Sequence, residues 1–227
     1  MLLCISTIKN KNMQHIIFDL DGTISNPETG ILNGYKYTFP TLDLPVPDDA
    51  TLRTLIGPPL RIVFEKMYQQ TPAKANEAIE TYRVYYNKLG GAFENELYNE
   101  MYDLLHTLFH QQRKLHIATH KGAMSHEILK HFGIRDYFTQ LQHYNEEKNI
   151  ITKEKMIELI LEKESISNLQ KTVMIGDRHS GIEAAKYTGI KSIGVTYGFG
   201  SQKEIEDSKP DFIANNVAEL HKILHQN

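Results

Sequence analysis

The sequence has little cysteine and no surplus of positive charge. Its 227 residues include one cysteine, Cys4, which excludes a disulfide framework within the chain and a zinc site built on several cysteines. Low cysteine content also fits a reducing compartment, so we expect a cytoplasmic protein. The formal net charge of −3 gives no basic footprint of the kind that nucleic-acid-binding proteins show. An anionic ligand must therefore be held by local groups.

Long apolar runs are also lacking. The opening MLLCISTIKNKN has a short apolar stretch, but no basic residue precedes it, and it is too short for a secretory signal or a membrane span. We interpret residues 1–12 as a frayed or disordered extension, with Met13 as an alternative start. We expect neither a nucleic acid nor a membrane as a partner.

Short apolar runs alternate with helical patterns along the rest of the chain. The apolar runs are continuous, as in parallel strands that are covered on both faces. The expected strands are HIIFDL (15–20), KLHIAT (114–119), TVMIG (172–176), KSIGVTY (191–197) and DFIA (211–214). The expected helices are ELYNEMYDLLHTLFHQQ (96–112), AMSHEILKHF (123–132), KEKMIELILEK (153–163), GIEAAKYT (181–188) and NVAELHKILH (216–225), with Gly133 and Gly189 as stops. This rhythm predicts a doubly wound α/β fold, which binds ligands at the carboxyl ends of its strands.

One interval breaks the rhythm. Residues 28–97 contain prolines and many tyrosines, are helical in pattern, and show no obvious buried strand. We therefore expect a small helical cap at 28–97, inserted into a core formed by residues 13–27 and 98–227.

Two acids follow the first expected strand. In IIFDLDGTI, Asp19 and Asp21 stand two residues apart and point to the same side if the chain stays extended. Neighbouring carboxylates repel unless a cation lies between them or one is protonated, and Mg²⁺ suits such oxygen ligands. Gly22 and Thr23 would then let the backbone turn close to a ligand. A polar turn after a strand is the alternative explanation for these residues.

Further polar residues stand at other strand ends. Thr119 ends KLHIAT and Lys121 follows closely, so a hydroxyl and a cation could bind the oxygens of an anion, although these residues alone favour a helix N-cap at Thr119. Asp177 follows TVMIG and could complete a magnesium site with the first aspartate. Lys153 and Lys155 stand at a helix start, where positive charge is unfavourable, which favours a role for one of them in a site, with solvated surface as the default explanation.

In this order along the chain, these strand-end residues and motifs resemble the four motifs of the haloacid dehalogenase superfamily of phosphohydrolases. DLDGT, a strand-end threonine, a lysine before the next strand and a strand-end GD are spread through one α/β core. The resemblance runs from Met13 to the end of the chain. It includes the helical cap, IGPPL (56–60) and VTYGFGS (195–201), which are similar to the phosphoglycolate phosphatase-like branch with its nucleotidase-like members.

The resemblance implies catalytic roles for these residues. Asp19 matches the nucleophile that forms an aspartyl-phosphate, and Asp21 matches the general acid and base. Thr119 matches the residue that hydrogen-bonds the transferred phosphoryl group. Four residues would contact the phosphate or the rest of the substrate: Gly22, Thr23, His120 and Lys121.

The resemblance also implies a Mg²⁺ cofactor. The lysine of the third motif corresponds most naturally to Lys153, with Lys155 and Lys148 as fallbacks. Asp177 would bind Mg²⁺ together with the nucleophilic aspartate and the backbone carbonyl of Asp21.

The sequence departs from the family pattern at two positions. His120 stands where serine or asparagine is frequent, and it either contacts substrate or points outward. Gly181 stands where the pattern GDxxxD places a second acid, while Glu183 would have to reach from another face of the helix.

We expect a magnesium-dependent phosphatase that acts on a small phosphomonoester, as a monomer or weak homodimer. Gly181 keeps open a catalytically weak phosphate-binding or regulatory protein, and a phosphomutase is a less favoured alternative.

Overall fold

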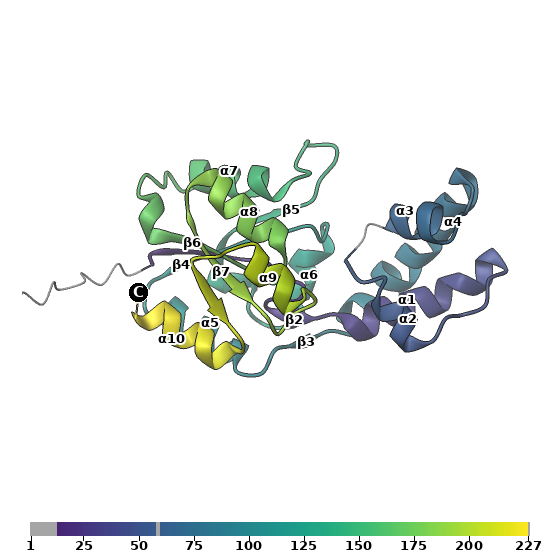
Figure 1. Cartoon of the computed structure of the whole chain (residues 1–227), viewed down its shortest axis with the longest axis horizontal. Coiled ribbons are helices and arrows are strands. Elements are labelled where there is room, and N and C mark those ends of the chain that lie inside the picture. Colours follow the sequence, from purple (N-terminus) through teal and green to yellow (C-terminus); the bar gives the residue numbers. More distant parts are fainter. Residues whose placement is uncertain (1–12, 58–59, 227) are drawn as a thin grey trace, which may run out of the picture.

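Six parallel strands form the centre of the molecule, in the order β5-β4-β1-β6-β7-β8 (Figure 1). Their bounds are β1 His15–Phe18, β4 Lys114–Thr119, β5 Phe138–His143, β6 Thr172–Gly176, β7 Lys191–Val195 and β8 Phe212–Ala214. The computed structural model of the chain describes residues 13–57 and 60–226. The expected extension of residues 1–12 lies outside these residues.

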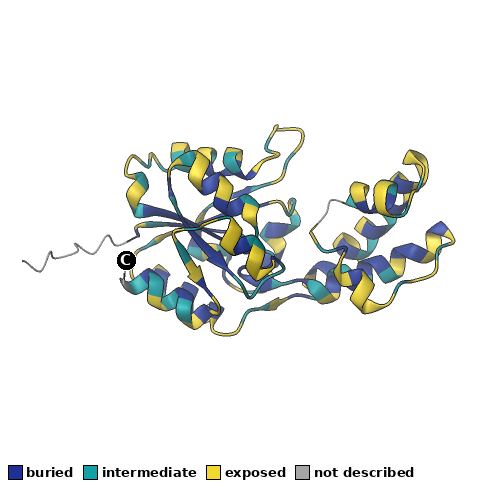
Figure 2. Ribbon diagram, viewed as in Figure 1, coloured by how far each residue is buried: buried dark blue, intermediate teal, exposed yellow. Residues whose placement is uncertain are grey.

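The central strand is buried on both of its faces. Ile16 and Phe18 belong to one apolar cluster, while Ile17 between them belongs to a second cluster on the other face. Helices α7 (Lys153–Lys163) and α8 (His179–Thr188) contribute to the second cluster. Helices α5 (Met101–His110) and α10 (Val217–Gln226) contribute to the first, and Figure 1 shows these pairs on opposite faces of the sheet. Burial on both faces explains the continuous apolar runs, and Figure 2 shows the strands as the most buried layer.

Several predicted elements are confirmed at their bounds. The strands predicted at 114–119 and 172–176 are β4 and β6, and the helix predicted at 153–163 is α7. Helix α6 (Met124–His131) and helix α8 both end before a glycine with positive φ, 67° at Gly133 and 75° at Gly189. Glycine adopts this conformation without the steric cost that a side chain brings, so the predicted helix stops are confirmed.

Other elements differ from the prediction. Strand β5 was not predicted, because FTQLQH is largely polar and only two of its six residues are buried at this edge of the sheet. The helix predicted from residue 96 begins at Met101, because Glu96–Leu97 pair as strand β3 and Glu100 has a φ of 63°. The short helix α9 (Gln202–Asp207) was also not predicted.

The helices between residues 28 and 93 lie beside the sheet rather than on it (Figure 1). Two antiparallel strands, β2 (Ser25–Asn26) and β3, carry the chain out and back. The helices are α1 (Glu28–Thr38), η1 (Phe39–Leu42), α2 (Asp49–Arg53), α3 (Leu60–Ile62), η2 (Val63–Met67), α4 (Pro72–Arg83), η3 (Val84–Lys88) and η4 (Gly91–Phe93). Among the described residues, no helix has the length and apolar character needed to cross a membrane.

The aromatic residues of this helical part form its core. The ring of buried Tyr35 lies 5.2 Å from that of Tyr82 and 6.1 Å from that of Phe64, measured between centroids. Phe39 packs on the same cluster, with its ring 6.2 Å from that of Phe64. Because each aromatic ring removes a large apolar area from water, a few rings suffice to hold these short helices together.

The sheet also buries a histidine. His116 in β4 is fully buried, with Nε2 3.2 Å from Nδ1 of His15 and Nδ1 3.0 Å from the hydroxyl of Thr139. Burial, with smaller effects from His15 and Lys114, lowers the pKa of His116 to about 3. This histidine is therefore neutral in the folded protein at and below neutral pH.

The buried histidine makes stability depend on pH. A histidine in the unfolded chain has a pKa of about 6.5, so between pH 6.5 and 3 the unfolded state binds more protons at His116 than the folded state. The free energy of unfolding should therefore fall on acidification, by up to about 1.4 kcal/mol per pH unit from this group. Urea unfolding at pH 7.0, 6.0, 5.0 and 4.0 measures the effect. In His116→Gln the free energy of unfolding should depend less steeply on pH than in the unchanged protein. His106 is exposed, so His106→Gln should keep the slope of the unchanged protein. Equal slopes for His116→Gln and the unchanged protein would contradict the role of His116.

Candidate active site

Three neighbouring strands end at the proposed site. Strand β1 lies between β4 and β6, and the chain continues from β1 to β4 and β5 on one side before returning to β6, β7 and β8 on the other. Such a reversal of strand order opens a crevice at the carboxyl ends of the strands. Asp19 follows β1, Thr119 ends β4, and Asp177 follows β6. All three line one cavity of about 930 Å³, which the helices of residues 28–93 also line.

Asp19 is paired with a buried lysine. Its Oδ2 accepts a hydrogen bond from Nζ of Lys153 at 2.7 Å, and its Oδ1 accepts one from the backbone N–H of Leu20 at 2.8 Å. Lys153 also donates to the carbonyl of Ala118 at 2.8 Å, and it is 2% exposed. A buried ammonium group needs such partners, because leaving water without them costs several kcal/mol.

The position of Lys153 follows from its helix. Thr152 caps α7 by accepting a hydrogen bond from the N–H of Lys155, and Lys153 is the first helical residue. Its side chain thereby reaches Asp19, 134 residues away in sequence. The side chain of Lys155 instead pairs with Glu158 near the surface, and Lys148 is exposed. Of the three lysines considered from the sequence, Lys153 is the one that contacts Asp19.

Asp21 is engaged by a second lysine. Its Oδ2 lies 2.9 Å from Nζ of Lys121, which also donates to the hydroxyl of Tyr86 at 2.6 Å and lies 4.6 Å from the centre of that ring. Burial raises the pKa of Asp21, and Lys121 opposes that effect. Burial by itself would lower the pKa of Lys121, but Asp21 and Tyr86 together raise it. The predicted phosphate ligand Lys121 is therefore occupied here in holding Asp21.

Asp177 is 1% exposed and fixed by a loop after β7. Its Oδ2 accepts a hydrogen bond from the N–H of Phe199 at 2.8 Å. A Cβ atom at Gly22 would lie 2.0 Å from this Oδ2, and one at Gly198 would lie 2.4 Å from the Asp177 Cβ. Burial and the nearby charge of Asp19 raise the pKa of Asp177 to about 7. The two glycines thus let the backbone close around a carboxylate whose charge needs a partner.

The carboxylates of Asp19 and Asp177 together suit a divalent cation. Two carboxylates offer the hard oxygen ligands that Mg²⁺ takes, and a cation beside them would relieve the repulsion that raises the pKa of Asp177. Within the part of the chain that the structure describes, no group of three or more His, Cys, Asp and Glu side chains could hold a metal. Because the Asp21 carboxylate faces Lys121, Asp21 would have to contribute its backbone carbonyl, and water would complete the shell.

The remaining predicted residues divide between the cavity and its wall. Thr119 lines the cavity and its hydroxyl accepts a hydrogen bond from the N–H of Lys121 at 3.2 Å; helix α6 begins only at Met124, so Thr119 is not a helix N-cap. His120 is exposed and lines the cavity.

Gly22 and Thr23 do not line the cavity. Thr23 is fully buried, and its hydroxyl lies 3.5 Å from Oδ1 of Asp177. Gly22 and Thr23 both pack against the carboxylate of Asp177. The contact with a phosphate that the sequence predicted for both residues stays a prediction.

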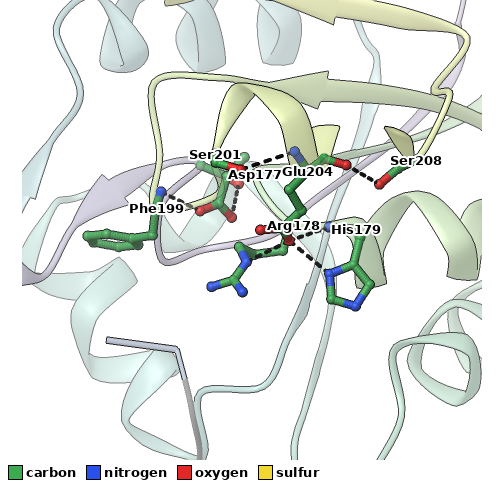
Figure 3. A network of polar contacts seen from close by, with 8 residues as sticks. Asp177, Arg178, His179, Phe199, Ser201, Glu204 and Ser208 are labelled. Atoms are coloured by element: carbon green, nitrogen blue, oxygen red, sulfur yellow. Dashed lines mark hydrogen bonds and ion pairs between the residues drawn. The ribbon is translucent and has the colours of Figure 1, made fainter. Parts of the chain in front are cut away.

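Other residues of the cavity were not identified from the sequence. Tyr86 contacts Lys121, whereas from the sequence its lining of a substrate cleft was less favoured than helix packing. Arg178 and His179 line the cavity beside Asp177, and Figure 3 shows both held by Glu204 of helix α9. Adjacency to Asp177 was the signal for Arg178. For the contact of Tyr86 with Lys121 no signal existed, because it crosses from the helical part to the sheet.

Comparison with known proteins identifies the family. The family model described as haloacid dehalogenase-like hydrolase matches residues 16–195. The chain is 33% identical over 211 residues to a 5'-nucleotidase from Pseudomonas aeruginosa, covering 92% of this chain and 95% of that protein. It is 24% identical over 226 residues to a phosphoglycolate phosphatase from Vibrio parahaemolyticus, covering 94% of this chain and 97% of the other.

A solved structure shows the same architecture. A haloacid dehalogenase-like family hydrolase from Streptococcus pneumoniae superposes with a TM-score of 0.84 at 30% identity, covering 93% of this chain and 98% of that chain. The resemblance seen in DLDGT, Thr119, Lys153 and GD is thereby confirmed at the level of the family and of the fold. The chain belongs to the haloacid dehalogenase-like hydrolase family.

Proposed function

We propose that this protein is a magnesium-dependent phosphatase that hydrolyses a small phosphomonoester through an aspartyl-phosphate on Asp19. The observation that carries the proposal is the contact between Asp19 and the buried Lys153, at a strand end shared with Thr119 and Asp177. The 5'-nucleotidase and the phosphoglycolate phosphatase among its relatives support phosphomonoester hydrolysis. The cavity of about 930 Å³ has room for more than a phosphate group.

In the first step, a carboxylate oxygen of Asp19 attacks phosphorus, and the bond from phosphorus to the leaving oxygen breaks. Asp21 gives its proton to that oxygen, so the product leaves as an alcohol. Lys153 and the hydroxyl of Thr119 bind oxygens of the phosphoryl group. Bound Mg²⁺, held by Asp19, Asp177 and the Asp21 carbonyl, would withdraw charge from that group.

In the second step, Asp21 takes a proton from water, which attacks phosphorus and releases phosphate and the Asp19 carboxylate. Lys121 holds Asp21 through both steps by its contact at 2.9 Å. We propose that residues 28–97 act as a cap on a core of residues 13–27 and 98–227. Since its helices line the same cavity, the cap would exclude bulk water from the first step.

The test is phosphate release from a panel of phosphomonoesters, with Mg²⁺ and after chelation. We expect turnover that depends on Mg²⁺. Magnesium binding without turnover of any ester would instead indicate the phosphate-binding or regulatory alternative raised by Gly181. Transfer of phosphate between positions of a sugar, without release, would indicate a phosphomutase.

Gly181 gives a quantitative prediction about the metal. It is buried in the first turn of α8, and a Cβ there would meet only Met174 Cε at 3.5 Å and Gly176 Cα at 3.8 Å. Glu183 is exposed and does not replace the missing acid. Gly181→Asp should tighten Mg²⁺ binding by about 10-fold, since groups around metal ligands alter affinity by about 10- to 100-fold.

Calorimetric titration of Mg²⁺ into the unchanged protein and Gly181→Asp measures this effect directly. Gly181→Asn is the matched control, because it adds the same volume without the charge, and it should give less than half of the gain in binding free energy. An unchanged magnesium dissociation constant in Gly181→Asp would show that this position is not coupled to the metal site.

A further inference from the structure

Arg178 follows the metal-site residue Asp177 and is oriented by a carboxylate outside the cavity. Its Nε donates to Oε1 of Glu204 at 2.9 Å, and Glu204 belongs to the short helix α9 that Ser201 caps (Figure 3). The same oxygen accepts hydrogen bonds from the backbone N–H of His179 at 3.0 Å and lies 2.8 Å from its Nδ1. Burial would raise the pKa of Glu204, but these contacts lower it to about 2, so the carboxylate is ionised.

This contact uses only one of the three guanidinium nitrogens. Among the described residues, no acceptor forms a hydrogen bond with Nη1 or Nη2 of Arg178. Figure 3 shows the two terminal nitrogens directed away from Glu204. Arg178 lines the cavity whereas Glu204 does not. Arg178 therefore brings unused donors to the wall of this cavity.

One of these two terminal nitrogens, Nη1, also approaches the helical part of the molecule. A Cβ atom on Gly57 would lie 2.7 Å from Nη1 of Arg178, and Gly57 has a φ of 110°. Glycine is the residue that combines this backbone conformation with so close an approach. The guanidinium thus reaches from the residue after Asp177 to Gly57 in the cap, and both Arg178 and Gly57 line the cavity.

The two lysines that contact Asp19 and Asp21 have their partners inside the site. Lys153 contacts Asp19, and Lys121 contacts Asp21. Arg178 differs, because its carboxylate partner lies behind it and leaves a fork of N–H donors open. A planar guanidinium with two free donors matches a carboxylate or phosphate in geometry, and such charge-assisted bonds are strong.

We propose that Arg178 determines specificity by binding a second anionic group, a carboxylate or a phosphate, on the part of the substrate that leaves. The inference rests on the proposed phosphatase function. An ion pair whose task is only to tie helix α9 to the loop after β6 would not discriminate between substrates. A specificity residue must do so.

The experiment compares three esters that differ in one group. 2-Hydroxyethyl phosphate has a neutral end, 2-phosphoglycolate has a carboxylate there, and ethylene glycol bisphosphate has a second phosphate. Phenyl phosphate and 4-carboxyphenyl phosphate repeat the comparison with a longer reach. For the unchanged protein, we expect kcat/KM to be at least about 10-fold higher for one anionic ester than for its neutral partner.

Arg178→Met should lower that ratio of kcat/KM values by about 10- to 100-fold, chiefly through KM. Arg178→Lys should lie between, since it keeps the charge but loses the fork. Arg83→Met is the matched control: Arg83 also lines the cavity, but it pairs with Glu80 at the surface, and its loss should leave the ratio within about twofold. Gly57→Ala displaces Nη1 of the guanidinium and should lower the ratio as Arg178→Met does.

The outcomes separate this inference from the proposed function. Turnover of the neutral esters tests the phosphatase function alone. A wild-type ratio below about twofold in both series would overturn the role of Arg178, and so would a ratio that survives Arg178→Met. If Arg178→Met does not fold, the ratios of the unchanged protein, Arg178→Lys and Gly57→Ala decide the question.

Discussion

Replacing Asp19 by asparagine is expected to lower the turnover of every phosphoester by about 10⁴-fold or more. Asparagine keeps the size of the side chain and can still accept a hydrogen bond from Lys153, which lies 2.7 Å from the aspartate oxygen. It lacks the anionic oxygen that would attack phosphorus, and loss of a catalytic nucleophile has effects of this size in other enzymes. Release of inorganic phosphate under saturating substrate and Mg²⁺ measures the change.

Asp211→Asn is the control for Asp19→Asn, because Asp211 also pairs with a lysine. Asp211 contacts Lys191 at 3.0 Å and accepts a hydrogen bond from the N–H of Ser192, away from the cavity. Asp211→Asn should keep turnover within about twofold. Circular dichroism must show that Asp19→Asn is folded at the assay temperature, because a buried lysine that loses its counter-charge destabilises the protein. A folded Asp19→Asn with more than about 1% of the original turnover would exclude Asp19 as the nucleophile.

The sequence predicted the part of the site that the strands carry. Continuous apolar runs located β1, β4 and β6, because these strands are buried on both faces. A parallel sheet brings their carboxyl ends to one edge, so Asp19, Thr119 and Asp177 could be grouped before the structure was known. Strand β5 carries a weak pattern because its edge position leaves most of its side chains partly exposed.

The contacts that cross between distant segments could not be predicted in the same way. Lys153 was favoured over Lys155 through the family resemblance. The structure gives a physical reason, because Thr152 is the N-cap residue of α7 and fixes the first turn, in which Lys153 lies. The contacts of Tyr86 with Lys121 and of Arg178 with Gly57 depend on how the helical part meets the sheet. No periodicity in either segment encodes that placement.

Gly22 shows a further limit of local sequence patterns. Its place in DLDGT predicted a turn that brings the backbone close to a ligand. In the structure, the absence of a side chain at Gly22 makes room for Asp177, which lies 155 residues later in the sequence. Gly22 has a φ of 76°, and its N–H donates to the carbonyl of Ser25 at 2.9 Å. The glycine therefore meets two requirements together, a left-handed backbone and a close approach to the Asp177 carboxylate.

Gly22→Ala is accordingly expected to lower kcat/KM by about 100-fold or more. A methyl group at this position would lie 2.0 Å from Oδ2 of Asp177, so the carboxylate must move, and displacement of about 1 Å at a reaction centre can cost that much. The left-handed backbone adds a cost of about 1–2 kcal/mol to folding. Phosphate release and urea unfolding measure the two effects separately.

Gly133→Ala isolates the cost of the backbone from that of the contact. Gly133 has a similar φ of 67°, but a Cβ there would meet nothing within 4 Å. Both variants should therefore lose about 1–2 kcal/mol of unfolding free energy from the strained residue, while Gly22→Ala alone loses kcat/KM. Gly22→Ala should also bind Mg²⁺ more weakly in a calorimetric titration, because the added methyl group displaces the carboxylate of Asp177. If the two variants retained equal activity, the packing of Gly22 against Asp177 would have no part in catalysis.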